Sequence, residues 1–411
     1  MNKIDFRQVV TALSDALDLV GIDDVQHGKR VAFMATECGR QLGMVPDQLD
    51  HLYHAALLHD CGVSSTIVHR NLVSELEWSG TESHCLRGHD LLAGLEVFAD
   101  LAPTIRYHHT HWDELETLGL PAELTRLTNC IYLTDRVDML VAQAGTANLL
   151  LAKDEIRRTI AKFRGHNFSP ELLDAFMRIS DSEYFWLTLQ PNHLNLYLAD
   201  MAMDSKPKLL SHAELLGIAK MFAAIVDAKS PFTAEHSLGV ANLAGYLATR
   251  MGLPMETCRE IEIAGLLHDL GKLVVPDEIL EKNGPLDDQE RAAMKRHSFE
   301  TFQILRRIEG FDGIVQMAAF HHETLAGDGY PFHIKDVGLT TEARIVAVAD
   351  IFQALAQNRP YRASMPLQDL LPILTAMADT GKLDREVVAT VLANPTGCWQ
   401  AATGSPGESP T

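Results

Sequence analysis

The sequence predicts an all-α protein built from two tandem helical domains that arose by internal duplication. With 411 residues, the chain is too long for one compact core, so two domains are expected. The segment AALLHDCG (55–62) returns as AGLLHDLG (264–271), and we find no convincing alternating pattern of a half-buried strand. Together these observations favour a duplicated helical unit.

The repeat extends over most of both halves with a slowly drifting offset. HGKRVAFMATECGRQLGM (27–44) matches HSLGVANLAGYLATRMGL (236–253) at an offset of 209 residues, and YHHTHWD (107–113) matches FHHETLA (320–326) at 213. Such drift is typical of a duplicated domain with small insertions. The predicted domains span 1–204 and 205–394.

The segments that join and end these domains are polar and rich in small residues. MDSKPK (203–208) is the candidate joint between the domains. The tail 395–411, PTGCWQAATGSPGESPT, is expected to be disordered because it has few apolar residues to bury.

Apolar spacing predicts the first and last long helices of the second half. Val240, Leu243 and Leu247 recur at i, i+3 and i+7, which places one apolar stripe on a helix that begins near His236. TEARIVAVADIFQALAQN (341–358) is also predicted to be helical.

Two further helices are expected between them. TCREIEIAGLLHDLGK (257–272) is typical of a buried helix, with Gly271 near its C-terminal end. PLDDQERAAMKRHSFETFQILRRI (285–308) is predicted to be capped by Asp287, with Glu290 three residues further on.

Composition excludes several classes of function. The formal net charge of -20 argues against general binding to nucleic-acid polymers or to an anionic membrane, although a local basic pocket could still hold a small anion. No apolar stretch has the length of a membrane span, and the N-terminus lacks the apolar core of a signal peptide. The six cysteines form no CxxC pair, which suits a cytoplasmic protein and argues against disulfides or a thiolate zinc site.

Each half retains the same set of candidate metal ligands. In the first half they are His27, His59, Asp60, His89, His108, His109 and Asp135. In the second half they are His236, His268, Asp269, His297, His321, His322 and Asp350. Ten of the chain's 19 histidines occupy these positions, and burying them without partners would be costly.

The ligand types indicate a dinuclear hydrolytic centre. Imidazoles and carboxylates without thiolates suit Fe, Mn or Zn better than Cu(I). Seven ligands are too many for one structural zinc, and an aspartate can bridge two ions with its two oxygens. Two metals a few ångström apart stabilise the attacking and leaving oxygens of a phosphodiester.

The second half resembles the HD-GYP family, a branch of the HD-domain metallophosphohydrolases. The resemblance covers about 150 residues of the second half and rests on HSLGV, LLHDLGKL, His297, HHETLAGDGYP and VADIFQALAQNRPYR, in this order. It implies two HD-type domains in this chain, with hydrolysis of cyclic di-GMP or 3'3'-cyclic GMP-AMP at a centre of two divalent ions, Fe or Mn, in the second. One metal would be held by His236, His268, Asp269 and Asp350, with Asp269 bridging to a second held by His297, His321 and His322.

The resemblance also implies which residues contact the substrate. Lys272 would contact the scissile phosphate, and Arg359 and Arg362 of NRPYR would hold phosphates or guanine. Tyr330 of the GYP turn would pack against the ligand or against the core. A C-terminal helix lysine and a solvated basic turn are the alternative explanations.

The sequence departs from the family pattern at three positions of the second half. Ala326 replaces an aspartate of the loop, and Gln353 stands where the family has the aspartate of DALT. Phe232 occupies the position of a glutamate that gives some members a third metal, so two metals are expected, with the linear dinucleotide as product.

The first half keeps its ligand types but not the substrate contacts. Val63 replaces the lysine, and neither a GYP turn nor an RPYR segment follows. We expect this half to be a regulatory or dimerising HD-like domain. A second metal site there, with some hydrolytic activity, stays open as an alternative because the ligand types are retained.

The predicted function is therefore that of a cytoplasmic cyclic-dinucleotide phosphodiesterase whose active site lies in the second domain, with a homodimer or a signalling protein as a further partner. A non-catalytic signalling adaptor that binds the nucleotide is the alternative. An HD enzyme acting on a nucleoside monophosphate or a deoxynucleoside triphosphate is a third reading, disfavoured by the GYP and RPYR motifs.

Overall fold

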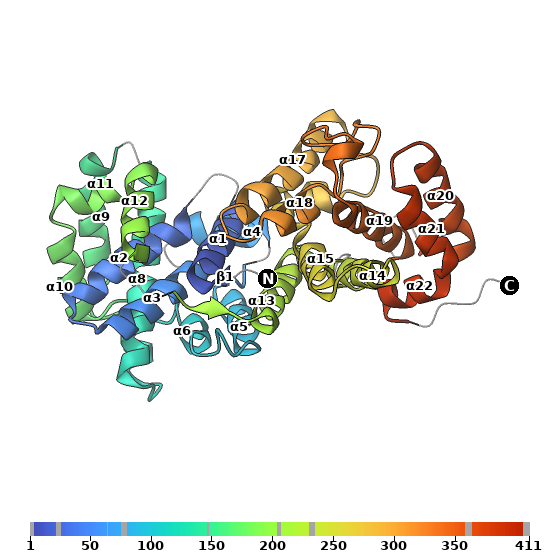
Figure 1. Cartoon of the computed structure of the whole chain (residues 1–411). Coiled ribbons are helices and arrows are strands. Elements are labelled where there is room, and N and C mark those ends of the chain that lie inside the picture. The colour runs from blue at the N-terminus through green and yellow to red at the C-terminus, as the bar shows by residue number, and fades with distance from the viewer. Residues whose placement is uncertain are drawn as a thin grey trace. The chain divides into compact units, whose positions relative to one another are not determined.

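The computed structural model confirms the all-α fold class (Figure 1). It describes residues 4–21, 26–63, 65–74, 80–145, 148–203, 207–229, 235–357 and 364–405. The described residues contain a single sheet, in which β1 (Ile4–Asp5) pairs antiparallel with β2 (Leu209–Leu210). No described helix is both long and apolar enough to cross a lipid bilayer.

The chain forms two compact units. The N-terminal unit is Val9–Lys208, and the C-terminal unit is Leu209–Thr411 together with Met1–Gln8. The first residues join the C-terminal unit through the β1–β2 pair and through Gln8, whose side-chain oxygen accepts a hydrogen bond of 2.9 Å from the backbone N–H of Glu309. The division falls at the end of MDSKPK, of which residues 204–206 lie outside the described part of the chain.

The N-terminal unit is helical throughout its described residues. Its elements are α1 (Phe6–Asp18, which begins within the first eight residues), η1 (Leu19–Gly21), α2 (His27–Gln41), α3 (Pro46–Leu58), α4 (Thr66–Ser74), α5 (Glu82–Ala93), α6 (Ala102–Arg106), α7 (Trp112–Leu115), α8 (Ala122–Ala144), α9 (Leu149–Ala161), α10 (Pro170–Ile179), α11 (Glu183–Thr188) and α12 (Pro191–Met203).

The C-terminal unit repeats this order of helices. Its elements after β2 are α13 (His212–Asp227), α14 (His236–Arg250), α15 (Met255–Leu267), η3 (Leu270–Val274), α16 (Asp277–Leu280), α17 (Asp288–Leu305), α18 (Asp312–Ala319), η4 (Asp336–Gly338), α19 (Thr341–Ala356), α20 (Leu367–Asp379), α21 (Arg385–Ala393) and α22 (Pro395–Thr403).

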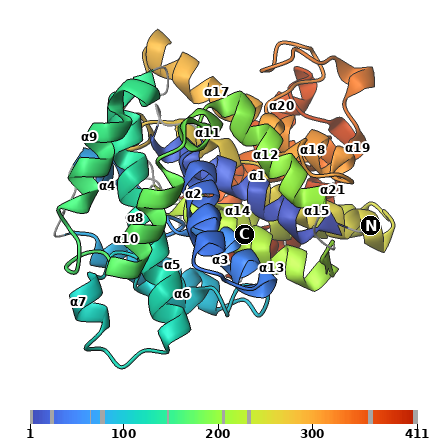
Figure 2. The ribbon, with the colours of Figure 1, turned by 90° about the vertical axis from the view of Figure 1, so that its left-hand side faces the viewer.

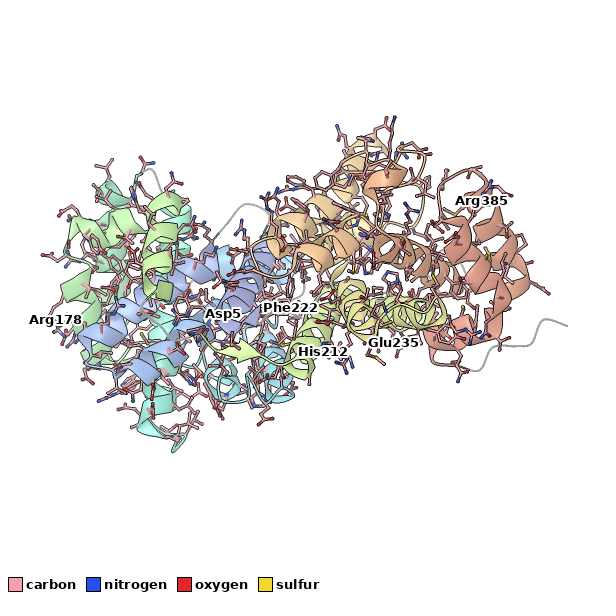
Figure 3. The ribbon with its side chains drawn as sticks, viewed as in Figure 1. Asp5, Arg178, His212, Phe222, Glu235 and Arg385 are labelled. Carbon is pink, nitrogen blue, oxygen red and sulfur yellow. The ribbon has the colours of Figure 1, made fainter. Side chains whose placement is uncertain are left out.

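Both cores are built around one central helix. α14 packs against α15 and α19. α2 packs in the same way against α3 and α8, which lie beside it in Figure 2. The predicted stripe of Val240, Leu243 and Leu247 is fully buried in α14. Figure 3 labels two residues of α13, His212 at its start and Phe222 within it. The side chain of Phe222 is fully buried.

The four predicted helices are present, with one boundary changed. α14 begins at His236, and Asp287 caps α17 by accepting a 2.9 Å hydrogen bond from the N–H of Glu290. α15 ends at Leu267, before the residues HDLGK that the sequence had assigned to it. The chain continues as the 3-10 helix η3 from Leu270, so His268 and Asp269 lie between the two helices.

The prediction of a disordered tail is wrong for its first half. Pro395–Thr403 form α22, whose N-cap Asn394 accepts a hydrogen bond from the N–H of Gly397. Cys398 and Ala402 are buried as α22 packs against α14, and this tertiary contact supplies the order that local composition does not. Residues 406–411 lie outside the described part of the chain.

Candidate metal centres and active site

The C-terminal unit brings its seven predicted ligands together from five parts of the fold. They lie at the start of α14 (His236), between α15 and η3 (His268, Asp269), in α17 (His297), after α18 (His321, His322) and in α19 (Asp350). The ligand atoms form two groups, each within 4.8 Å, which are His236, His268, Asp350 and His297, His321, His322.

Asp269 stands between these two groups. Its Oδ2 lies 3.5 Å from Nε2 of His236 and 3.2 Å from Nε2 of His268. Its Oδ1 lies 3.6 Å from Nε2 of His297 and 3.9 Å from Nε2 of His321. Each carboxylate oxygen therefore faces a different group, which is the arrangement that a bridging ligand requires.

The imidazole rings are held with Nε2 pointing into the cluster. Backbone carbonyls of the preceding turn accept from Nδ1 of His268 (2.7 Å), His297 (2.6 Å) and His321 (2.6 Å). Nδ1 of His236 is instead 2.5 Å from the side-chain oxygen of Gln353. Hydrogen bonds of this kind fix the tautomer and the orientation of histidine ligands.

The cluster contains buried polar atoms that the described residues leave without hydrogen-bond partners. They are Nε2 of His236, Nε2 of His268 and Oδ1 of Asp269. Because unpaired buried polar groups are rare and costly, these atoms point to a bound group that completes them. Neutral imidazoles and carboxylates are suitable ligands for divalent first-row metals, so the residues present fit a metal centre.

The charge states of Asp269, His297 and His322 also favour cation binding. Burial by itself raises the pKa of Asp269, but His268 and Lys272 outweigh it and hold that pKa well below its ordinary value. Burial lowers the pKa of His297 to about 3 and that of His322 to about 4. The cluster thus offers an ionised carboxylate beside two neutral imidazoles.

The break after α15 depends on a glycine. A Cβ on Gly271 would lie 2.0 Å from the carbonyl oxygen of His297, so only glycine lets η3 pass this close to α17. Thr301 fixes the same contact, because its hydroxyl accepts from the N–H of Gly271 (2.9 Å) and donates to the carbonyl of His268 (3.1 Å). The glycine of HDxGK therefore aligns the ligands of two helices.

A cavity of about 490 Å³ opens over this cluster. It is lined by Val226, Asp227, Asp269, Lys272, Ile279, Leu280, Lys282, Gly284, Leu286, Met294, His297, His322, Tyr330, Asp350, Ile351, Ala354 and Leu355. Lys272 forms an ion pair with Asp269, and the ring of Tyr330 lies 4.7 Å from that of His322 between centroids. Candidate metal ligands, lysine side chains and an aromatic ring thus line one concave surface.

The GYP loop is fastened to the cluster by Glu323, which the sequence analysis did not assign. Its buried carboxylate accepts from the N–H groups of Phe332 (2.7 Å) and Ile334 (2.9 Å). A Cβ on Gly329 would lie 2.5 Å from both Cα of Glu323 and the carbonyl oxygen of His322. The loop therefore packs backbone against backbone beside a candidate ligand. The glutamate of the HHE motif was the available signal.

Three residues named in the sequence analysis cannot be located. Arg359, Arg362 and Phe232 lie outside the described residues. Their predicted roles remain predictions.

The N-terminal unit builds a similar cluster around Asp60. Oδ2 of Asp60 lies 3.6 Å from Nε2 of both His27 and His59, and its Oδ1 lies 3.6 Å from Nε2 of His84 and 3.8 Å from that of His108. The aspartate again divides its oxygens between two groups of histidines.

The remaining ligands of this unit complete the likeness. Oδ1 of Asp135 lies 3.6 Å from Nε2 of His27, as Asp350 lies near His236. Nε2 of His109 lies 3.7 Å from Oδ2 of Asp135.

The assignment of His89 to this cluster is wrong, and His84 takes its place. Nδ1 of His89 is 2.9 Å from Oδ1 of Asp90, and its side chain is 35% exposed. His84 precedes His297 by 213 residues, the offset that also relates the two HH pairs, and this agreement was the signal that could have identified it. A Cβ on Gly62 would lie 1.9 Å from the carbonyl oxygen of His84, which repeats the contact made by Gly271.

Space and charge in front of the two clusters differ. The cavity described at the N-terminal cluster measures about 10 Å³, and Val63 lines it where the other unit has Lys272. Arg136 donates to Oδ2 of Asp135 over 2.8 Å and so places a positive charge on that ligand. The described residues of the N-terminal unit leave little room for a substrate.

Known proteins with similar sequences support the division into two HD domains. Models of the HD domain match residues 25–140 and 197–387. The 3'3'-cGAMP-specific phosphodiesterase 1 of Vibrio cholerae serotype O1 is 34% identical over 99% of this chain and 95% of its own length. The chain belongs to the HD-GYP family.

Two other relatives bear on substrate and fold. A cyclic di-GMP phosphodiesterase of Thermotoga maritima is 36% identical over 44% of this chain and 48% of its own length. A crystal structure of a cyclic GMP-AMP-specific phosphodiesterase of V. cholerae is similar with a TM-score of 0.66 and 26% identity, covering 95% of this chain and 98% of that one. The likeness to that solved structure therefore includes both HD domains.

Proposed function

We propose that the C-terminal unit hydrolyses 3'3'-cyclic GMP-AMP and opens its ring to a linear dinucleotide. The protein is a metal-dependent phosphodiesterase of cyclic dinucleotides, as its membership of the HD-GYP family implies. The observation that carries the proposal is Asp269, whose two oxygens face two groups of histidines beneath a cavity of about 490 Å³.

Two divalent ions, iron or manganese, fit the two groups of ligands. His236, His268 and Asp350 would hold one, and His297, His321 and His322 the other, with Asp269 shared. When bound, such ions supply positive charge at the phosphate and lower the pKa of the attacking water.

The chain's own residues orient the phosphodiester and balance its charge. Lys272 lines the cavity beside Asp269, so its ammonium group can contact a phosphate oxygen in the transition state. The water oxygen forms a bond to phosphorus, one ester P–O bond breaks, and the proton ends on the leaving ribose oxygen. Tyr330 offers an aromatic face on which a nucleobase can stack.

The choice of substrate rests on how much of the chain each relative covers. The cGAMP-specific relative from V. cholerae matches both HD domains, whereas the cyclic di-GMP phosphodiesterase of T. maritima matches 44% of this chain. Cyclic di-GMP is the second candidate substrate, because the C-terminal unit resembles enzymes of both kinds.

Location and further partners remain predictions. All six cysteines are buried and free, which supports the prediction of a cytoplasmic protein. Association as a homodimer or with a signalling protein is inferred from the sequence of the N-terminal half.

To test this, metal-loaded protein purified without oxygen is incubated with each cyclic dinucleotide separately, and the products are separated by chromatography. We expect a linear dinucleotide to form faster from 3'3'-cyclic GMP-AMP, and no product from Asp269→Ala. Faster hydrolysis of cyclic di-GMP would overturn the substrate assignment. Tight binding of nucleotide and metal without any product would show that the protein acts as a signalling adaptor instead.

A further inference from the structure

The N-terminal cluster contains a donor that its C-terminal counterpart lacks, the thiol of Cys85. Sγ of Cys85 lies 3.7 Å from Nε2 of His84, and it lies 3.5 Å from Nδ1 and 4.0 Å from Nε2 of His108. The residue 213 positions later is Ser298, whose hydroxyl oxygen is 3.2 Å from Nε2 of His297. A sulfur atom therefore replaces an oxygen at the same place in the duplicated fold.

Three donors lie here at separations that suit one tetrahedral ion, and Sγ of Cys85 lies beside two of them. Nε2 of His84 and Nε2 of His108 are 3.3 Å apart, and Oδ1 of Asp60 lies 3.6 Å and 3.8 Å from them. Zinc bound by nitrogen at 2.0–2.1 Å and by sulfur at 2.3 Å requires donor separations of roughly 3.3 to 3.6 Å. Shifts of a few tenths of an ångström would bring Sγ of Cys85 to the distances from Nε2 of His84 and Nε2 of His108 that a shared ion requires.

Unpaired polar atoms around this point independently indicate a bound cation. Within the described residues, Oδ1 of Asp60 and Nε2 of His109 are buried without a hydrogen-bond partner, and the side chain of His109 is only 5% exposed. Nδ1 of His108 donates to the carbonyl oxygen of Ile105 at 2.7 Å, which leaves Nε2 directed at the cluster. A bound cation would give these buried polar atoms the partner that they lack.

The other group of the same unit is less suited to a cation. Asp138 contacts Nδ1 of His27, the ring nitrogen opposite the one that faces Asp60, with its Oδ2 at 2.8 Å. Arg30 donates to the same carboxylate over 2.6 Å. Arg136 already neutralises Asp135 in front of His27. A second cation would meet this guanidinium at short range, where like charges repel. Among the described residues, the hydrogen bonds and ion pairs of Cys85, His84 and His108 involve no arginine or lysine.

We propose that the N-terminal unit holds a metal centre of its own, in which Cys85 joins Asp60, His84 and His108 as a sulfur ligand to one thiophilic divalent ion of the zinc type. The ligands comprise one carboxylate, one thiolate and two neutral imidazoles, so their charge balances that of the ion. Thiolate ligands select zinc over manganese, whereas the C-terminal ligands are all nitrogen and oxygen. Cys85, His84 and His108 do not line the described cavity of about 10 Å³ in this unit, so the role of the centre is to stabilise the unit rather than to hydrolyse a substrate.

This proposal does not rest on the activity of the C-terminal unit, and its test reads the sulfur ligand directly. The full-length Asp269→Ala variant, which weakens the C-terminal centre, is stripped of metal and titrated with Co²⁺. We expect a sulfur-to-cobalt charge-transfer band in the near ultraviolet, which Cys85→Ser in the same background abolishes. Cys85→Ser should also weaken Zn²⁺ binding by about 10- to 100-fold and lower the melting temperature of the zinc-loaded protein.

Cys61→Ser is the matched control, because Cys61 is next to Asp60 in sequence while its Sγ lies 3.8 Å from the carbonyl of Gly88. It should keep the charge-transfer band. Absence of the band from protein with Cys85 intact, or its survival in Cys85→Ser, would overturn the proposal; the first result would leave only nitrogen and oxygen ligands. Cys85→Ala provides a second variant should the serine variant not fold, and the band in the Asp269→Ala parent tests the sulfur ligand in either case.

Discussion

The closeness of the GYP loop to the ligand cluster makes Gly329→Ala an informative substitution. The new Cβ would lie 2.5 Å from Cα of Glu323 and from the carbonyl oxygen of His322, and 2.6 Å from the N–H nitrogen of Thr324. Ordinary contacts of a Cβ begin at 3.4 Å, and all three neighbours are backbone atoms that cannot rotate away. The loop must therefore move by about 1 Å, which is the scale of overpacking in a well-filled core.

That displacement acts on both the candidate ligand His322 and the cavity residue Tyr330. The N–H of Tyr330 donates to the carbonyl of His322 over 3.2 Å, so the two residues shift together. A misplacement of 1 Å near reacting groups costs about 100-fold in rate, and we expect this loss in kcat/KM for the cyclic dinucleotide. The free energy of unfolding should fall by about 1–3 kcal/mol.

The assay combines steady-state hydrolysis with metal content and urea unfolding. Gly313→Ala in α18 is the control, because its Cβ would meet Cε of Met317 at an ordinary 3.5 Å. It should keep full activity and gain up to about 1 kcal/mol of stability from the helix propensity of alanine. Wild-type kcat/KM and stability in Gly329→Ala would refute the argument that the loop packs backbone against backbone.

Three further substitutions test the roles of single side chains. Lys272→Ala should lower kcat about 100- to 1,000-fold while metal content stays unchanged, because a transition-state contact is lost; loss of metal would contradict this role. Glu323→Ala leaves the N–H groups of Phe332 and Ile334 without their acceptor, so the free energy of unfolding in urea should fall by about 1–3 kcal/mol. An unchanged midpoint of urea unfolding would refute the anchoring of the loop by Glu323. Burial lowers the pKa of Lys229 from 10.5 to about 8, although Asp277 lies nearby. The unfolded chain therefore binds this proton more tightly than the folded protein does, and the free energy of unfolding should rise as the pH increases from about 8 to 10.5. Lys229→Met should remove this part of the rise in urea unfolding, and an identical pH profile in the variant would contradict it.

The sequence was sufficient for the helices and for most of the candidate ligands that the structure brings together, because the duplication repeats them in both halves. His268 and Asp269 were identifiable from HDLG alone, and Asp287 with Glu290 signalled the start of α17. His84 lies at the offset of 213 residues that relates the two HH pairs, whereas His89 lies at 208, close to the 209 of the two His-Asp pairs. The contact of Gly62 with the carbonyl of His84 decides between them.

Other features depend on contacts that no local pattern reports. α22 forms in a segment rich in small and polar residues because Cys398 and Ala402 pack against α14. The same holds for Arg136, which follows Asp135 directly in sequence but pairs with it only because both are buried in α8. The anchoring of the GYP loop by Glu323 is also a tertiary contact, across nine residues to Phe332.

The most direct test of the division of labour compares Asp269→Ala with Asp60→Ala on 3'3'-cyclic GMP-AMP. Each substitution removes the aspartate that faces both groups of histidines in its own unit. The account predicts that Asp269→Ala abolishes formation of the linear dinucleotide and lowers metal content, while Asp60→Ala keeps most of the activity and loses only the metal of the N-terminal unit. Equal loss of activity in both variants would contradict the assignment of the chemistry to the C-terminal unit.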